Sequence, residues 1–345
     1  MNRRPVWYET QMRAPRTLLA LGLVALGPVA LALAGCGAPA PRAAAWVPPP
    51  AASTAPSAPA SEPGRDGPPL PVPGKVMLGA YLDLSGMDEV QSLALRRQQL
   101  GRDPRILHRY YQWTDPLPDS AADLPAGAVL LISWDGTGYA PINNGSQDGL
   151  IAAAADALAR YRRPVFLRWA WEMNGDWFAW GGPKNGNNPA GYVAAWRHLH
   201  DIFVAHGATN VAWVWGPNAG SVPAVSWNDM ARYYPGDGYV DWVGVSGYLM
   251  GRETPDSLFD GIVRAYGGRK PVMLAETGAL EKGGSVKADW IDQLARWVIA
   301  HPPVAAVVWF DTDNDKGTGK NWRIDSTPAA LAAYQRLAAD PHFAG

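Results

Sequence analysis

The sequence predicts an α/β protein whose main domain is a single (β/α)8 TIM barrel. Eight short apolar runs follow Lys75, and each of them ends in polar or aromatic residues. Helix-periodic segments separate several of the runs, and strands that alternate with helices favour a parallel sheet. Residues 75–345 also have about the length that one such barrel needs.

The apolar runs are interpreted as the barrel strands, because short runs rich in Val, Ile and Leu suit strands that are buried on both faces. They comprise residues 76–83, 106–113, 129–135, 165–174, 211–218, 240–248, 272–278 and 304–311. In a parallel barrel the carboxyl ends of the strands meet at one rim, where side chains from different strands can act together.

One of the intervening helices is well marked. Asn188 and Pro189 supply an N-cap and a first-turn proline, and the helix is expected to end near Gly207. Residues 114–127 consist mostly of turn residues, so this connection is less clear. Further helix-periodic segments are residues 87–100, 286–300 and 327–339.

The N-terminus has the pattern of a secretory signal. Arg13 and Arg16 precede the apolar run 18–33, and small residues follow before Cys36. The ending Leu-Ala-Gly-Cys resembles a bacterial lipobox, which implies a lipoprotein signal peptide over residues 1–35 and lipidation of Cys36. Because Cys36 is the only cysteine, no disulfide is expected. We expect the chain to be exported and lipid-anchored to the bacterial cell envelope, at the outer membrane.

Residues 36–74 are almost wholly Ala, Pro, Ser and Gly, a composition that cannot bury a core. They are predicted to be an extended linker between the membrane anchor and a soluble, monomeric domain at 75–345. The net charge of −1 and the absence of a basic patch argue against nucleic acid as a partner. The 17 tryptophans suit stacking on sugar rings, although several could equally fill a large core.

The segment 164–180 is predicted to be the centre of the site. Its apolar strand ends in the carboxylate of Glu172, and strand alternation would place Arg168 and Glu172 on one face. Burying both groups without a purpose would be costly. The run 270–278 repeats this design and ends in Glu276 and a glycine.

Glu172 and Glu276 would therefore lie across the barrel mouth from each other. Two carboxyls about 5–5.5 Å apart can cleave a glycosidic bond with retention, one as acid/base and one as nucleophile. Arg168 and Tyr248 could keep Glu276 ionised. Either glutamate alone could instead cap a turn or pair with an arginine, but two at matching strand ends favour catalysis.

Three segments in order resemble glycoside hydrolase family 26. They are Arg168-x-x-x-Glu172-Met-Asn-Gly-x-Trp177 with Trp180-Gly181, then 234–248 with Val-Asp-Trp-Val-Gly and Tyr248, and Ala275-Glu276-Thr-Gly278. The resemblance implies that Glu172 is the acid/base, Glu276 the nucleophile and Tyr248 the hydroxyl bonded to that nucleophile. It also implies a retaining endo-glycosidase acting on a β-linked polysaccharide, with β-1,4-mannan first and mixed-linkage β-glucan or β-1,3-xylan as alternatives.

One residue departs from the family pattern. Family mannanases usually have a histidine before the acid/base, where this chain has Trp171. An indole offers one donor and a broad stacking face, so Trp171 either changes the sugar specificity or packs outward against the helices.

Several other side chains are candidate substrate contacts. Trp309 is expected to face inward on the last strand as a platform beneath the sugar, and Trp177 and Trp180 lie in the loop after Glu172. Asp135 and His108 lie at strand ends on inward faces, with His108 a structural or substrate contact. No cluster has metal-ligand spacing, and no nucleotide motif is present, so no metal or cofactor is expected.

Two other functions remain open. A barrel that binds polysaccharide without cleaving it would not need both glutamates, and an enzyme that trims the cell's own exopolysaccharide would suit the outward-facing anchor equally well.

Overall fold

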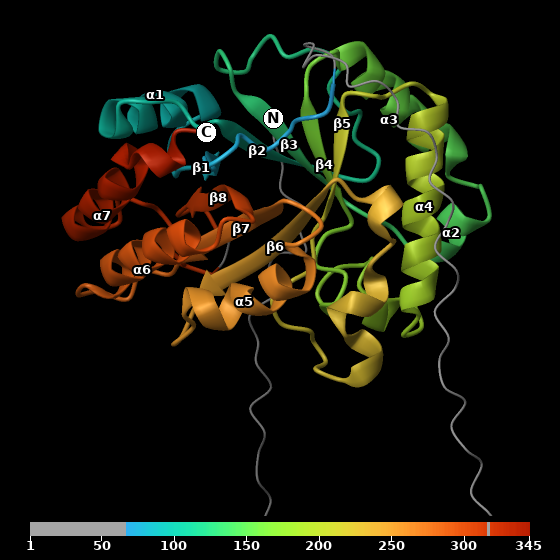
Figure 1. The fold of residues 1–345 in the computed structure, drawn as a ribbon. Coiled ribbons are helices and arrows are strands. Elements are labelled where there is room, and N and C mark those ends of the chain that lie inside the picture. The colour runs from blue at the N-terminus through green and yellow to red at the C-terminus, as the bar shows by residue number, and fades with distance from the viewer. Residues whose placement is uncertain (1–66, 316–317) are drawn as a thin grey trace, which may run out of the picture. The chain divides into compact units, whose positions relative to one another are not determined.

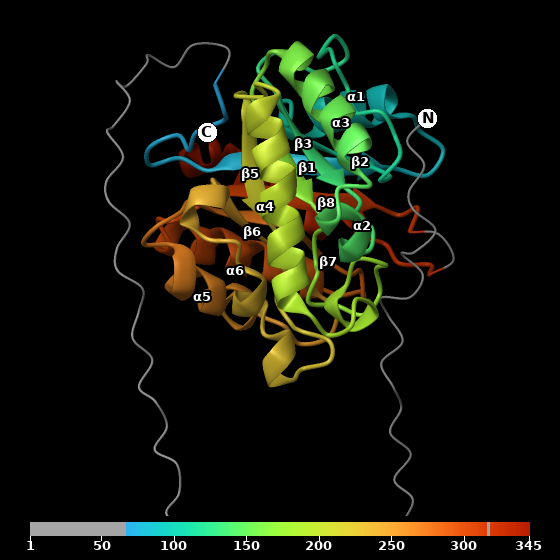
Figure 2. The same ribbon diagram turned by 90° about the vertical axis from the view of Figure 1, so that its right-hand side faces the viewer.

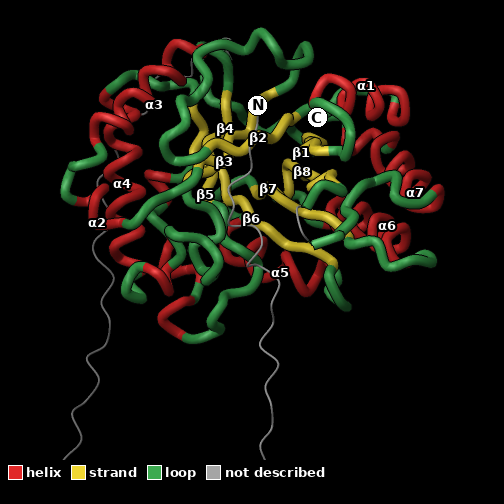
Figure 3. The backbone as a smooth tube through the Cα atoms, turned by 180° about the vertical axis from the view of Figure 1, so that it is seen from behind, coloured by secondary structure: helices red, strands yellow, loops and turns green. Residues whose placement is uncertain are grey.

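The computed structural model describes residues 67–315 and 318–345, and these form a closed barrel of eight parallel strands. Each strand pairs with its neighbours in chain order, and β8 closes on β1 with Met77 opposite Ala306. Figure 3 shows the strands gathered in the centre with the helices around them. The (β/α)8 fold predicted from the sequence is confirmed. The strands are β1 Met77–Asp83, β2 Ile106–Tyr111, β3 Val129–Trp134, β4 Val165–Trp169, β5 Val211–Trp215, β6 Trp242–Leu249, β7 Val272–Ala279 and β8 Val304–Thr312.

The helices pack against the outside of the strands, as Figures 1 and 2 show. Their starts are set by local caps: the Asp88 carboxylate accepts from the backbone N–H of Gln91, and the Asn188 side chain accepts from that of Gly191. The α-helices are α1 Glu89–Leu100, α2 Tyr139–Asn143, α3 Asp148–Tyr161, α4 Pro189–Ala205, α5 Pro255–Tyr266, α6 Val286–Ala300 and α7 Pro328–Ala339.

Two connections differ from a regular alternation of strand and helix. The chain between β2 and β3, which is described throughout, has turns and extended segments but no helix. Between β5 and β6 the chain forms three short 3-10 helices, Ser226–Asn228, Met230–Tyr233 and Asp237–Tyr239. The turn-rich composition of 114–127 is thus matched by an irregular connection.

Two apolar layers hold the barrel together. The barrel interior is filled by side chains such as Met77, Phe166, Val214 and Met273, all nearly inaccessible to solvent. The outer layer, between strands and helices, is rich in tryptophan and includes Trp134, Trp169, Trp196, Trp213 and Trp297. Many of the indoles therefore fill the core, which is one of the two roles, core packing or stacking on sugar rings, that the sequence left open.

Cys36 and the predicted signal peptide lie outside the described residues, as does most of the predicted linker. The last residues of that linker pack against the barrel, since the indole N–H of Trp242 donates to the carbonyl of Pro69 at 3.0 Å. None of the helices in the described part of the chain has the length and apolar character that a membrane span requires.

Candidate active site

Glu172 lies just beyond β4 at the carboxyl rim of the barrel. The strand ends at Trp169, and both Ala170 and Glu172 adopt left-handed backbone conformations with φ of 43° and 53°. Such conformations are unfavourable for residues other than glycine, so the surroundings must hold them. The backbone N–H of Glu172 donates to the carbonyl of Gly216 at 2.8 Å. Glu172 therefore reaches the rim through a turn, whereas the sequence predicted a continuous strand.

The carboxylate of Glu172 is fully buried and is held by an indole. Trp177 Nε1 donates to Glu172 Oε2 at 2.7 Å. An indole N–H can only donate, so this oxygen must act as an acceptor. A proton on Glu172 would therefore be carried by Oε1. Trp177 is thus a partner of the carboxylate as well as a candidate substrate contact.

Glu276 lies within β7 and is also fully buried. Arg168 Nη1 donates to Glu276 Oε2 at 2.8 Å, and the hydroxyl of Tyr110 donates to the same oxygen at 2.6 Å. The hydroxyl of Tyr248 donates to Glu276 Oε1. Three charge-assisted hydrogen bonds to one carboxylate fix its orientation and favour its ionised form.

Arg168 extends from β4 through the barrel interior to reach this carboxylate. It also donates to the hydroxyl of Ser246 and, at 3.3 Å, to that of Ser133. Gly216 leaves room for it, because a Cβ there would lie 2.6 Å from Arg168 Nε. The predicted pairing of Arg168 with Glu276 is present, whereas the strand face predicted to be shared by Arg168 and Glu172 is interrupted because β4 ends at Trp169.

The pKa values of the two glutamates are shifted in opposite directions. Burial, reinforced by the negative charge of Glu276, raises the pKa of Glu172 to about 7. Burial would also raise the pKa of Glu276, but the charge of Arg168 and the hydrogen bonds from Tyr110 and Tyr248 outweigh it and lower that pKa to about 2. Near neutral pH the site can therefore hold one protonated and one ionised carboxyl. This is the division of roles that acid/base and nucleophilic chemistry need.

A cavity of about 240 Å³ opens beside this pair. Trp177 and Tyr248, which bond the two glutamates, form part of its wall. Phe310 and Trp322 add further aromatic surface, and Asn218 and Ser221 add polar groups. Aromatic faces combined with a few polar groups suit a sugar ring.

Trp309 does not line this cavity, and the expectation of an inward platform is wrong. Its ring packs against Trp290 of α6 and Tyr334 of α7, with centroids at 6.0 Å and 5.3 Å. The interior face of β8 carries Ala306, Val308 and Phe310, so the parity assumed from the sequence was shifted by one residue. Trp322, from the loop after β8, provides the indole at the mouth.

Trp180 is likewise a packing residue. It is buried, stacks on Phe178 at 4.4 Å and donates from Nε1 to the carbonyl of Trp171 at 2.7 Å. No face is left for a substrate, which corrects the predicted contact.

Trp171 is buried between these rings and the site. Its ring lies 5.4 Å from that of Tyr110, and the Arg168 guanidinium lies 5.5 Å from its centroid. It therefore packs beneath the residues that hold Glu276, and its effect on sugar specificity stays a prediction.

Asp135 directly follows β3 at the rim, whereas His108 lies within β2 as its third residue. His108 Nε2 is 2.7 Å from Ser133 Oγ, and its ring lies 4.5 Å from that of Tyr110. Burial, with a smaller contribution from the charge of Asp115, raises the pKa of Asp135 to about 8. Neither side chain lines the 240 Å³ cavity, so any direct contact of these two residues with substrate stays a prediction.

A second, open groove of about 740 Å³ lies on the β1–β2 side of the mouth. Tyr81 and Tyr111 line it together with carboxylates that include Asp83, Glu89 and Asp123. Tyr81 stacks on Phe310 with centroids 5.4 Å apart, which makes the two hollows neighbours at the rim.

The sequence did not single out four residues of the site: Tyr110, Ser133, Ser246 and Trp322. Tyr110 could have been found, because it lies two residues after His108 on the same strand face. Trp322 had no local signal, since it reaches the mouth from a loop. In the described residues no group of acidic, His or Cys side chains could hold a metal ion.

A (β/α)8 barrel with two buried glutamates at its rim, one with a raised pKa and one with a lowered pKa, has the design of a retaining glycoside hydrolase. Residues 129–327 match the model of glycosyl hydrolase family 26. The chain belongs to this family of glycoside hydrolases.

Relatives of several specificities resemble the chain. It is 34% identical over 277 residues to "Endoglucanase H" of Acetivibrio thermocellus, an alignment that covers 75% of this chain and 30% of that protein. It is 28% identical over 159 residues to "Beta-1,3-xylanase TXYA" of a Vibrio species, covering 46% and 32% of the two chains. It is 32% identical over 136 residues to "Mannan endo-1,4-beta-mannosidase A and B" of Caldalkalibacillus mannanilyticus, covering 38% and 25%. The chain thus spans about a third or less of these relatives' length.

Solved structures show the same fold. A family 26 β-mannanase from Bacteroides ovatus superposes with a TM-score of 0.59 at 17% identity, covering 78% of this chain and 90% of that one. An endo-β-1,4-mannanase from Cellulomonas fimi superposes with a TM-score of 0.58 at 19% identity, covering 78% and 72%.

Proposed function

We propose that this protein is a retaining endo-glycosidase that cleaves a β-linked polysaccharide, with Glu172 as acid/base and Glu276 as nucleophile. The observation that carries the proposal is a pair of buried carboxyls beside one aromatic cavity, one with a raised pKa and one with a lowered pKa. The open groove next to the cavity supports action within a chain rather than on a single terminal sugar.

In the first step, Glu276 attacks the anomeric carbon and forms a glycosyl ester. The bond to the leaving oxygen breaks, and Glu172 gives that oxygen its proton. In the second step, the ionised Glu172 takes a proton from water, and the hydroxide oxygen attacks the anomeric carbon. The ester bond breaks and both carboxyls return to their starting states.

The donors around Glu276 fit these steps. Arg168 and Tyr110 both bond Oε2, while Tyr248 bonds Oε1. They keep the nucleophile ionised before attack and hold the leaving carboxylate when the ester breaks. Because they are fixed by the barrel, little reorganisation is needed during the reaction.

For the substrate, we place β-glucan first and β-1,4-mannan second. The likeness to a protein named an endoglucanase extends over 75% of this chain, compared with 38% for the bacterial mannosidase. Trp171, which replaces the histidine usual in family mannanases, packs against Tyr110 and Arg168 beneath the nucleophile. Mannan stays a candidate because two relatives named mannan endo-1,4-beta-mannosidases are each 32% identical over 38% and 36% of this chain.

Two variants test the assigned roles. Glu276→Ala should lose all turnover, because no ester can form. Glu172→Ala should lose at least about 10³-fold on polysaccharide yet still react with aryl glycosides whose leaving groups need no proton. Burst kinetics and reducing-end release measure both effects. Equal and complete loss of both variants on activated glycosides would contradict the division of roles.

The substrate is tested by offering residues 67–345 β-mannan, glucomannan, mixed-linkage glucan and β-1,3-xylan side by side, with Glu276→Ala as the blank. Release from mixed-linkage glucan alone supports our order, and release from mannan alone reverses it. Tight binding without release from any glycan would favour a non-catalytic binding barrel. Activity confined to the cell's own exopolysaccharide would point to processing rather than to foraging.

The location in the cell rests on sequence alone. We propose export as a lipoprotein anchored through Cys36, because the segment that precedes it has the order of a bacterial lipoprotein signal. Labelling of cells with a fatty-acid probe should mark the wild-type protein. A Cys36→Ser variant that is labelled equally would contradict this proposal.

A further inference from the structure

The loop between β8 and α7 carries Trp322 to the substrate cavity. This indole lies 5.0 Å from the ring of Tyr248 and 6.2 Å from that of Phe310, measured between centroids. Trp322 forms a wall of the cavity. Tyr248, which it contacts, donates to the nucleophile, so a single side chain separates Trp322 from Glu276. A small movement of this loop would change the shape of the cavity where a sugar must fit.

The backbone on both sides of Trp322 is held by side chains from other elements. Lys287 Nζ, on the first turn of α6, donates to the carbonyls of Asn321 at 3.2 Å and Arg323 at 2.9 Å. Trp309 Nε1 donates to the carbonyl between them, that of Trp322, at 2.9 Å. Three consecutive carbonyls are thus each bonded to a side-chain donor.

Lys287 is an unusual residue for a purely structural contact. Its side chain is 2% exposed, and its nearest carboxylate, that of Glu281, lies 3.7 Å away. Burial lowers the pKa of Lys287 to about 8, although the charges of Glu281, Asp311 and Asp325 act in the opposite direction. Burying an amine at this cost is explained if its hydrogen bonds are needed to fix the loop.

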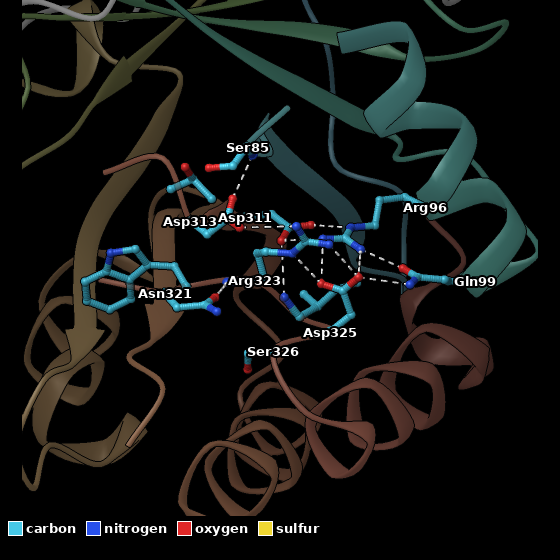
Figure 4. A network of polar contacts seen from close by, with 12 residues as sticks. Ser85, Arg96, Gln99, Asp311, Asp313, Asn321, Arg323, Asp325 and Ser326 are labelled. Atoms are coloured by element: carbon cyan, nitrogen blue, oxygen red, sulfur yellow. Dashed lines mark hydrogen bonds and ion pairs between the residues drawn. The ribbon is translucent and has the colours of Figure 1, made fainter. Parts of the chain in front are cut away.

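Ion pairs anchor both ends of the same loop, as Figure 4 shows. Arg96 of α1 donates to both oxygens of Asp311, at 2.6 Å and 2.9 Å, and pairs with Asp325 at 2.8 Å. Arg323 pairs with Asp325 at 2.7 Å and with Asp313 at 3.2 Å. With its ends fixed by this network, the loop's centre is held by backbone hydrogen bonds from Trp322 to Thr312 and from Glu281 to Asn321, and by the side-chain donors of Lys287 and Trp309.

We propose that Lys287 and Trp309 are positioning residues that act through Trp322 to set the affinity of the enzyme for its glycan. Neither residue touches the cavity. Each bonds the backbone around Trp322, whose indole forms a wall of the cavity. Trp309 was expected to be the substrate platform, and it instead supports Trp322. This inference rests on the proposed function, since it concerns the substrate cavity of that glycosidase.

Kinetics on the best glycan test the proposal. Lys287→Met and Trp309→Phe each remove a donor and keep most of the side-chain volume. Each should raise KM about three- to tenfold, as expected for loss of one or two hydrogen bonds, with kcat within about twofold of wild type. Lys287→Arg should recover much of the affinity. Lys282→Met, an exposed lysine close by in the chain, is the matched control and should leave KM unchanged.

A second readout does not depend on activity. In protein labelled with 5-fluorotryptophan, the ¹⁹F signal of Trp322, assigned through Trp322→Phe, should shift or broaden in Lys287→Met but not in Lys282→Met. If no glycan is cleaved, the proposed function fails, and this signal still decides the inference. An unshifted signal, or a fall in kcat in proportion to lost folded protein with KM unchanged, would overturn it. If Lys287→Met does not fold, Trp309→Phe provides both tests.

Discussion

At the scale of single residues, the site depends on donors that make two identical side chains behave differently. Glu172 and Glu276 are both fully buried, so desolvation acts on both. Glu276 accepts hydrogen bonds from an arginine and two tyrosine hydroxyls, whereas Glu172 has the indole of Trp177 and the hydroxyl of Ser246 as partners. The difference in pKa therefore comes from the partners and not from burial.

Trp177→Phe should move the alkaline limb of kcat/KM to higher pH. The indole hydrogen bond favours the ionised form of Glu172, so its loss raises a pKa that now lies at about 7. The acid stays protonated to higher pH, which is the direction of the expected change. We also expect kcat at the optimum to fall roughly tenfold, because the carboxyl is less well oriented.

The pH dependence of kcat/KM on the best glycan measures this shift. Trp196→Phe is the control, because it also removes a buried indole donor, but one that bonds the carbonyl of Tyr239 in the helix layer. A limb that stays in place, or moves to lower pH, would show that Trp177 does not act on Glu172.

At the scale of elements, a position without a side chain beside one strand makes room for a long side chain from its neighbour. Gly216, just beyond β5, gives Arg168 of β4 the space to reach Glu276 of β7. Arg168 thereby links four strands, because it also bonds Ser246 of β6 and Ser133 of β3. The acid/base, by contrast, depends on the turn after β4, where two non-glycine residues have left-handed conformations.

Gly216→Ala should impair the nucleophile more than the fold. The new methyl group would lie 2.6 Å from Arg168 Nε and would displace the guanidinium from Glu276. Losing that charge raises the pKa of Glu276, so the acid limb of activity should move to higher pH. We expect kcat/KM to fall at least about tenfold at the optimum.

Gly261→Ala, at an open position on α5, is the matched control and should keep full activity. Unfolding in urea separates the two effects in Gly216→Ala. A loss of activity that merely follows the loss of folded protein would contradict a specific effect on Arg168.

At the scale of the whole molecule, the packing of the C-terminal segment and the catalytic candidates are at opposite ends of the barrel. The C-terminal segment packs at the start of β1, where Val76 donates to the carbonyl of His342 at 2.7 Å and Phe343 is buried. The glutamates lie at the other end, where the strands finish. Changes at the first end should therefore alter stability without altering catalysis.

Phe343→Ala should lower the free energy of unfolding by about 3 kcal/mol, as expected for an aromatic ring removed from a core. Its kcat and KM should match wild type below the unfolding transition. Thermal unfolding followed by circular dichroism, together with kinetics at 25 °C, checks both parts. A change in KM for this variant would mean that the two ends of the barrel are coupled.

Local patterns in the sequence determined the barrel, most strand positions and the candidates Glu172 and Glu276. Short apolar runs and capping residues act through neighbours in the chain, so they can be interpreted without the fold. The same holds for Arg168 and Tyr248, which lie at or near the ends of strands whose direction was already predicted. Family resemblance supported the same residues.

The tertiary structure alone decided which indoles meet the cavity. Trp309 and Trp322 are both buried tryptophans near the end of β8, but a shift of one residue in strand parity turns Trp309 toward the helices. Trp322 lies at the mouth in a loop that is held by the buried Lys287 of α6 and by the ion pairs of Arg96 on α1. Contacts between residues far apart in the chain fix these positions, and no local periodicity encodes them.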